Sequence, residues 1–115
     1  MISLVTVHDG IIFNESDDIV GNLSNHVIRS SSEPIIGSGV ILGNSKDGFV
    51  YDGRSVVAGY GVRVGHCAEG LLYRSGKPIL KSGDFVGHLS DCKVEGNLTD
   101  DDRMAIWHFL VKKIF

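Results

Sequence analysis

A phrase of four residues recurs along this chain at a constant spacing of 22 residues. It reads Ile-Val-Gly-Asn, Ile-Leu-Gly-Asn, Arg-Val-Gly-His and Phe-Val-Gly-His. Its copies end at Asn22, Asn44, His66 and His88. A unit of this length holds one hairpin of short strands, which cannot bury its own apolar face. The copies are therefore expected to stack or to pack around a common axis.

The turn signals between these copies favour an all-β fold of short strands. Runs of β-branched and aromatic residues are interrupted by dipeptides that predict hairpin turns. These dipeptides are Asp9-Gly10, Asp52-Gly53 and Ser75-Gly76. The glycines of residues 59–67 predict corners between strands. A phosphate-binding loop is followed by a lysine–serine or lysine–threonine pair and a helix, and neither follows these glycines.

Residues 98–115 break the pattern and predict a helical extension after a β-repeat domain of residues 1–97. Thr99 is a suitable N-cap, aspartates follow in the first turn and lysines in the last, so a helix is predicted over about residues 100–113. A strand is the alternative, because residues 106–111 are rich in β-formers. Four apolar residues fall on one face, which we expect to pack on the β-core rather than dock onto a partner: Met104, Trp107, Val111 and Ile114.

Composition limits the classes of partner. The net charge is −3 and the basic residues are scattered, which disfavours nucleic-acid binding. No apolar run approaches the roughly 20 residues that span a bilayer, so no stable membrane insertion is expected. The first ten residues lack a basic signal-peptide region, so we expect a soluble protein made without general secretory export.

The histidines and cysteines follow the repeat and predict a zinc site. His66 and His88 are equivalent, and so are His26 and Cys92, each four residues after the end of its phrase. If the units pack around an axis, three imidazoles and one thiolate converge as a closed, structural zinc set. Cys67 lies beside His66 and could replace one of these ligands. His8 and His108 lie outside these positions and are expected to be ordinary surface or core residues.

Residues 76–84, Gly-Lys-Pro-Ile-Leu-Lys-Ser-Gly-Asp, resemble the signature of the PAAR-repeat family. Residues 78–81 stand where that family has Pro-Ala-Ala-Arg, and residues 53–61 look like a degraded copy. The Ala-Ala-Arg part is absent. Gly-Asp is intact only at Gly83-Asp84, and Val40 and Val62 replace the aspartate in the middle units. The resemblance covers about residues 1–97. It implies a small conical β-fold with a zinc ion near its point, held by three histidines and one cysteine.

The resemblance also implies a function that is not enzymatic. Such a protein caps and sharpens the trimeric β-helical spike of a contractile phage tail or a type VI secretion apparatus. We expect a monomer that binds one copy per spike trimer, located at a virion tail tip or in the cytoplasm before delivery. Two alternatives are a small hydrolase using Cys67 or Cys92 with a histidine and Asp84 or Asp91, and an adaptor or immunity-type binding module.

Overall fold

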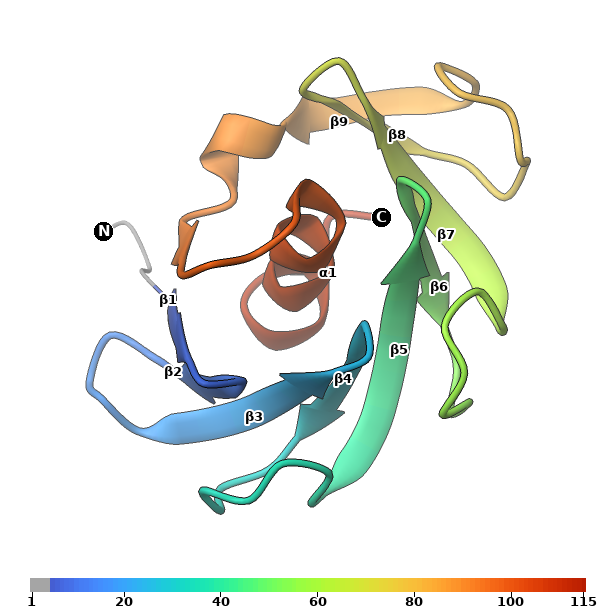
Figure 1. Cartoon of the computed structure of the whole chain (residues 1–115). Helices are drawn as coiled ribbons and strands as arrows, with labels where there is room; N and C mark the ends of the chain where they lie inside the picture. The colour runs from blue at the N-terminus through green and yellow to red at the C-terminus, as the bar shows by residue number, and fades with distance from the viewer. Residues whose placement is uncertain (1–4) are drawn as a thin grey trace.

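A computed structural model describes residues 5–115 as one ten-stranded sheet and one α-helix, which bears out a mostly β fold with a C-terminal helix. The sheet curls around the helix (Figure 1), and its strand order is β10-β1-β2-β3-β4-β5-β6-β7-β8-β9. The elements are β1 (Val5–His8), β2 (Ile11–Phe13), β3 (Ile19–Ser24), β4 (Val27–Ser30), β5 (Val40–Lys46), β6 (Phe49–Asp52), β7 (Val62–Ala68), β8 (Leu71–Arg74), β9 (Asp84–His88), the 3₁₀ turn η1 (Leu89–Asp91), β10 (Val94–Glu95) and α1 (Asp100–Leu110).

Two-residue turns join the strands of each hairpin. Both turn residues have positive φ at Asn25-His26, Asp47-Gly48 and Glu69-Gly70, as a type I′ turn requires. The turn predicted at Asp9-Gly10 is confirmed between β1 and β2. The turns predicted at Asp52-Gly53 and Ser75-Gly76 are wrong, because these dipeptides begin long loops instead.

The hairpins recur at the spacing of the sequence phrase. The pairs β3–β4, β5–β6 and β7–β8 are each followed by a loop, which covers residues 31–39, 53–61 or 75–83. The register shifts at Ile28/Arg29, Val50/Tyr51 and Leu72/Tyr73, which are 22 residues apart. We call these hairpins with their loops the first, second and third units. They lie side by side along one sheet, so equivalent positions in neighbouring units are about 10 Å apart, which is two strand spacings.

The chain leaves this pattern after β9, which begins the fourth unit. η1 replaces the hairpin turn, and β10 pairs in parallel with β1 through Val5 opposite Val94 and Thr6 opposite Glu95. β9 therefore pairs only with β8 and forms one edge of the sheet.

The inner face of the sheet holds the core. Ile12, Ile28, Val50 and Leu72 come from alternate strands and are at most 2% exposed. They cluster with the fully buried helix residues Met104, Ala105 and Ile106. The predicted packing of the helix on the β-core is confirmed, although more than one helix face is buried because the sheet wraps around it (Figure 1).

The predicted start of the helix is also confirmed. The Thr99 hydroxyl accepts the backbone N–H of Asp102 at 3.2 Å, which satisfies one of the free donors of the first turn. The helix ends at Leu110, three residues before the predicted end, and residues 112–115 continue without helical structure.

Two strand glycines of the repeated phrase are required by close packing against the helix and the C-terminal tail. A Cβ placed on Gly43 would overlap the ring of Phe109, and one on Gly65 would overlap the ring of Phe115. The corner prediction is wrong for Gly65, which lies within β7, where close approach of the Phe115 ring excludes a side chain. The corner prediction holds for Gly59 and Gly61, which have φ of 93° and 122° in the second loop.

Candidate functional site

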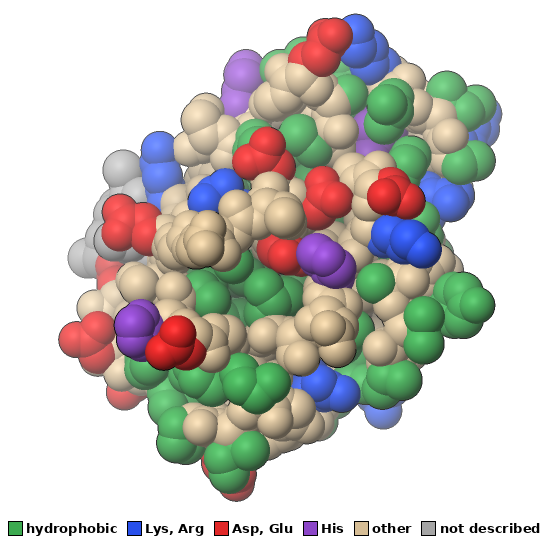
Figure 2. All heavy atoms as spheres, viewed as in Figure 1, with side chains coloured by type: hydrophobic (Ala, Val, Ile, Leu, Met, Phe, Trp, Pro, Cys, Tyr) green, Lys and Arg blue, Asp and Glu red, His purple; other side chains and the backbone are tan. Residues whose placement is uncertain are grey.

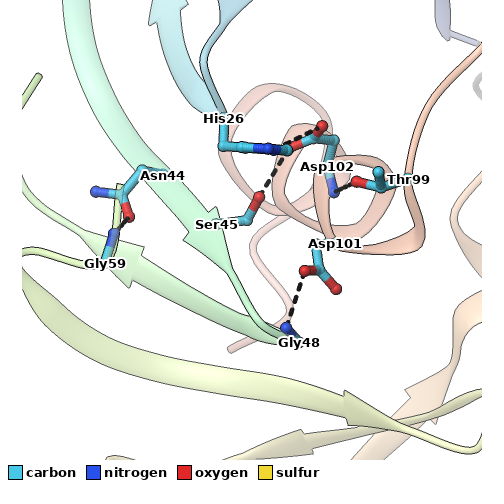
Figure 3. A network of polar contacts seen from close by, with 8 residues as sticks. All are labelled: His26, Asn44, Ser45, Gly48, Gly59, Thr99, Asp101 and Asp102. Atoms are coloured by element: carbon cyan, nitrogen blue, oxygen red, sulfur yellow. Dashed lines mark hydrogen bonds and ion pairs between the residues drawn. The ribbon is translucent and has the colours of Figure 1, made fainter. Parts of the chain in front are cut away.

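The phrase-ending residues of the first two units anchor the loops that follow them. Asn22 Nδ2 donates to the Ser38 carbonyl at 3.0 Å, and its Oδ1 accepts the Gly37 N–H at 3.1 Å. Asn44 does the same in the second loop. Its Oδ1 accepts the Gly59 N–H at 2.8 Å (Figure 3), and its Nδ2 donates to the Tyr60 carbonyl at 2.8 Å. Both asparagines are fully buried, and each side chain supplies the hydrogen bonds that backbone groups of the loop above it would otherwise lack.

His66 anchors the loop of the third unit in the same way. Its Nε2 accepts the backbone N–H of Lys81 at 2.9 Å, and the ring is fully buried between Phe49 and Tyr73. Burial lowers the pKa of His66 below its usual range, which keeps the imidazole neutral and Nε2 free to accept. We call Asn22, Asn44 and His66 the anchor residues.

His88 occupies the equivalent position in the fourth unit but anchors nothing. Its side chain is 59% exposed, since the chain after it turns into η1 instead of a hairpin and loop. Its backbone N–H donates to the Asp91 carboxylate at 3.2 Å. Its ring packs edge-on against Phe85 with centroids 5.4 Å apart.

The four predicted zinc ligands are distributed over the molecule. His26 lies in the turn between β3 and β4, His66 lies under the third loop, and Cys92 belongs to the core after η1. His88 and Cys92 line the same hollow. Among residues 5–115, no group of three or more histidine, cysteine or acidic side chains is placed to hold a metal ion. The zinc site stays a prediction.

The sheet geometry explains this distribution. Zinc convergence assumed that equivalent side chains of the units point to a shared axis, whereas the sheet curls around α1 and the helix fills the centre (Figure 1). In space, the rings of Tyr73 and Phe85 lie one after the other between the imidazoles of His66 and His88. Neighbouring residues of a strand point to opposite faces, so His66 faces outward while Cys67 packs against the core.

A polar network at the start of α1 was not expected from the sequence (Figure 3). The buried carboxylate of Asp102 lies 2.9 Å from His26 Nδ1 and accepts the Ser45 hydroxyl at 2.8 Å. The neighbouring Asp101 carboxylate accepts the Gly48 N–H at 2.8 Å. The network fastens the helix start to the turns of the first and second units. The aspartates after the N-cap were visible, but their partners are 53 to 76 residues away in the chain.

This network resembles part of an acid–base system without completing one. His26 is half exposed and borders a hollow of about 400 Å³ that Lys46, Asp47 and Thr99 also line. The Ser45 hydroxyl donates to Asp102, so it is not directed at His26 as a nucleophile would be. The observed hydrogen bonds serve attachment of the helix.

The cysteines do not suit nucleophilic chemistry. Burial raises the pKa of the Cys67 thiol, and it raises the pKa of the Cys92 thiol to about 11. The thiolate is the reactive form of cysteine, and a raised pKa keeps each thiol mainly protonated at neutral pH. The geometry therefore gives the hydrolase alternative no support.

The loops of the three units carry exposed apolar residues at equivalent positions. Ile35, Val57 and Ile79 are 22 residues apart and at least half exposed. Figure 2 shows apolar side chains gathered along the lower and right-hand margins, where Figure 1 places these loops. Among residues 5–115, every exposed large apolar side chain lies between residues 35 and 85: Ile35, Ile36, Val40, Val56, Val57, Tyr60, Val62, Ile79, Leu80 and Phe85. We call the loop members Ile35, Ile36, Val56, Val57, Ile79 and Leu80 the apolar tips.

The other two histidines agree with their expected roles. His8 is exposed beside Asp9, and His108 is buried with its Nδ1 accepting the N–H groups of Ile114 and Phe115. Burial lowers the pKa of His108 to about 4, consistent with a neutral acceptor.

Comparisons with known proteins supply no relative. A scan against protein-family models, a search of curated proteins and a search of solved structures each found no match. Within residues 5–115, no helix is both long enough and apolar enough to cross a membrane.

Proposed function

We propose that this chain is a non-catalytic docking module that binds another protein through the apolar tips. The observation that carries the proposal is the confinement of exposed large apolar side chains to three equivalent loops and the residues next to them. Apolar patches on a protein surface mark interaction sites when they are contiguous and large. Scattered single residues would not have recurred at positions 22 residues apart.

The anchor residues support this proposal because they hold the loops in shape before binding. Each loop is attached to the sheet through a buried side chain, so little conformational entropy is lost when its tip becomes buried. Burying an aliphatic side chain fully contributes about 1.5–3 kcal/mol. The six tips are 44–64% exposed, so each has apolar surface that a partner could bury.

The more specific proposal is the spike-tip function that the PAAR resemblance implies. In that version the fold is a conical repeat of 22-residue units, and one monomer caps a trimeric β-helical spike at a phage tail or a secretion apparatus. Three equivalent loops offer one contact for each chain of a threefold partner. Docking would not require the predicted zinc ion, because the anchor residues hold the loops that form the docking surface.

Co-expression with a candidate β-helical spike, followed by size-exclusion chromatography with light scattering, tests the proposal. We expect one copy of this chain per three spike chains, with weak dependence on salt because apolar burial drives binding. The double variant Ile79→Ser/Leu80→Ser should lose the complex, while the surface variant Thr6→Ser/His8→Ser, at two exposed positions of β1, should keep it. An equally stable complex with the tip variant would contradict docking through the apolar tips.

A further inference from the structure

The edge strand β9 lacks the partner that its equivalents have. In the three complete units the phrase-bearing strand pairs with a second strand of the same hairpin, namely β4, β6 or β8. The segment that would pair with β9 by the same spacing is β10, but it pairs with β1 instead. β9 is therefore a sheet edge with no neighbouring strand on its free side, which is a template for strand addition.

A hollow lies beside this edge where an incoming side chain would point. Its volume is about 670 Å³, and it lies between β9, the segment after η1 and the C-terminal part of α1. Leu72, Val86, Trp107, Val111 and Ile114 contribute apolar walls. The second residues of β4, β6 and β8 are Ile28, Val50 and Leu72, and all three are buried against the core. A strand added to β9 would place an aliphatic side chain in the hollow.

The charges around the hollow favour an acidic occupant. Lys93 and Lys112 line it, opposed by the single carboxylate of Asp91. On the outer face, Phe85 and His88 end the row of contacting rings that begins at Phe49. A cross-strand neighbour with an aromatic side chain would extend this row.

We propose that the free edge of β9 binds an extended acidic segment of another protein as an added antiparallel strand. An aliphatic residue of that segment enters the hollow beside Val86, and acidic residues on either side face Lys93 and Lys112. The Asp91 carboxylate now accepts the His88 N–H, so it must move away when the added strand takes that donor. The proposal uses residues other than the apolar tips and does not depend on the docking function proposed above.

Fluorescence anisotropy with the labelled peptide Glu-Glu-Tyr-Val-Tyr-Glu-Glu tests this binding. We expect saturable binding that is about tenfold weaker when the glutamates are replaced by lysines, from the loss of two rim ion pairs. Replacing the tyrosine that follows the valine by proline should abolish binding, since this residue lies opposite His88 and proline removes its ladder N–H. Equal binding of the glutamate and lysine peptides, or no binding up to 1 mM peptide, would overturn the proposal.

Variants of the chain locate the site. Lys93→Glu/Lys112→Glu changes two exposed side chains and should reverse the preference in favour of the lysine peptide. Asp91→Asn should bind the glutamate peptide severalfold more tightly, because it removes the competing carboxylate. The tip variant Ile79→Ser/Leu80→Ser should bind the peptide normally, which separates this site from the docking surface. Amide shift changes on the loops instead of residues 84–88 would place the peptide elsewhere and refute the assignment, as would β9 pairing between two copies that excludes the peptide.

Discussion

The first three units and the fourth carry the same phrase in different surroundings. In the complete units a second strand and a loop follow, and Asn22, Asn44 and His66 are buried beneath that loop. In the fourth unit the chain turns into η1, and His88 is exposed at an edge. The same sequence position is thus a structural anchor or a free surface group, depending on the segment that comes after it.

The difference teaches that a repeat predicts equivalent positions but not where their side chains meet. His66 and His88 match in sequence, yet one accepts a backbone N–H and the other faces solvent. The zinc prediction took the second of two arrangements that the repeat allows, in which the copies pack around an axis. The rings of Tyr73 and Phe85 lie between His66 and His88, and the zinc site stays a prediction. The predictions below compare the three complete units with the fourth unit, which lacks a second strand.

The largest effect is expected from filling the inner face of a complete unit. Gly43→Ala should lower the free energy of unfolding by about 3 kcal/mol, because the added methyl group overlaps the Phe109 ring and the Tyr51 carbonyl. Gly76→Ala is the matched control, since its nearest non-neighbouring atom is 3.6 Å away and its φ is not positive. Urea denaturation of both variants measures the difference, and equal stabilities would contradict close packing of the helix on the second unit.

Acidification should loosen the C-terminal tail that lies against the third unit. The pKa of His108 is lowered to about 4 in the folded chain, from 6.5 in the unfolded chain. The unfolded state therefore binds more protons between these values, so stability should fall by up to about 3 kcal/mol as pH decreases from 7 to 4.

A substitution isolates this effect from other groups. His108→Gln keeps an acceptor for the tail N–H groups but cannot titrate, so its stability should change less over the same pH range. Thermal unfolding at several pH values gives both curves. Parallel curves for the two proteins would show that His108 does not set this dependence.

The attachment of the helix start to the first and second units should be worth about 2 kcal/mol. Asp102→Ala removes a buried carboxylate and leaves His26 and Ser45 without their partner. Asp100→Ala, in the same turn but with a side chain 69% exposed, is the control. Urea midpoints compare the two, and a larger loss for Asp100→Ala would reject the network as the attachment.

The smallest effect on stability is expected at the apolar tips. Ile79→Ser/Leu80→Ser should change the free energy of unfolding by less than about 0.5 kcal/mol, because these side chains are already exposed. A large loss would mean that the tips pack within the fold and are not a docking surface. Chemical denaturation of the purified variant is sufficient.

The sequence predicted features that rest on local chemistry. The N-cap at Thr99, the helix and the recurrence of hairpins follow from residue type and spacing alone. The second aspartate–glycine dipeptide of residues 47–53 was chosen as a turn, but the turn uses the first, where both residues adopt positive φ. Two similar dipeptides five residues apart cannot be ranked without knowing the strand pairing.

The candidate sites depend on long-range contacts that no local pattern contains. Asp102 meets His26 across 76 residues, and the fate of His88 depends on β10 pairing with β1. That both Asn and His serve as anchors became visible only with the loops in place. The exposed tips could have been found by placing Ile35, Val57 and Ile79 in the repeat and noting that they lie between strands.

The comparison between His66 and His88 tests the central claim most directly. Equilibrium unfolding in urea should be measured for His66→Ala and His88→Ala, with added zinc and with a chelator. We expect His66→Ala to lose about 2 kcal/mol in both conditions, from a buried cavity and an unpaired Lys81 N–H. His88→Ala should lose less than about 0.5 kcal/mol. Equal losses for the two variants that appear only when zinc is present would contradict the anchor account and establish the predicted zinc site instead.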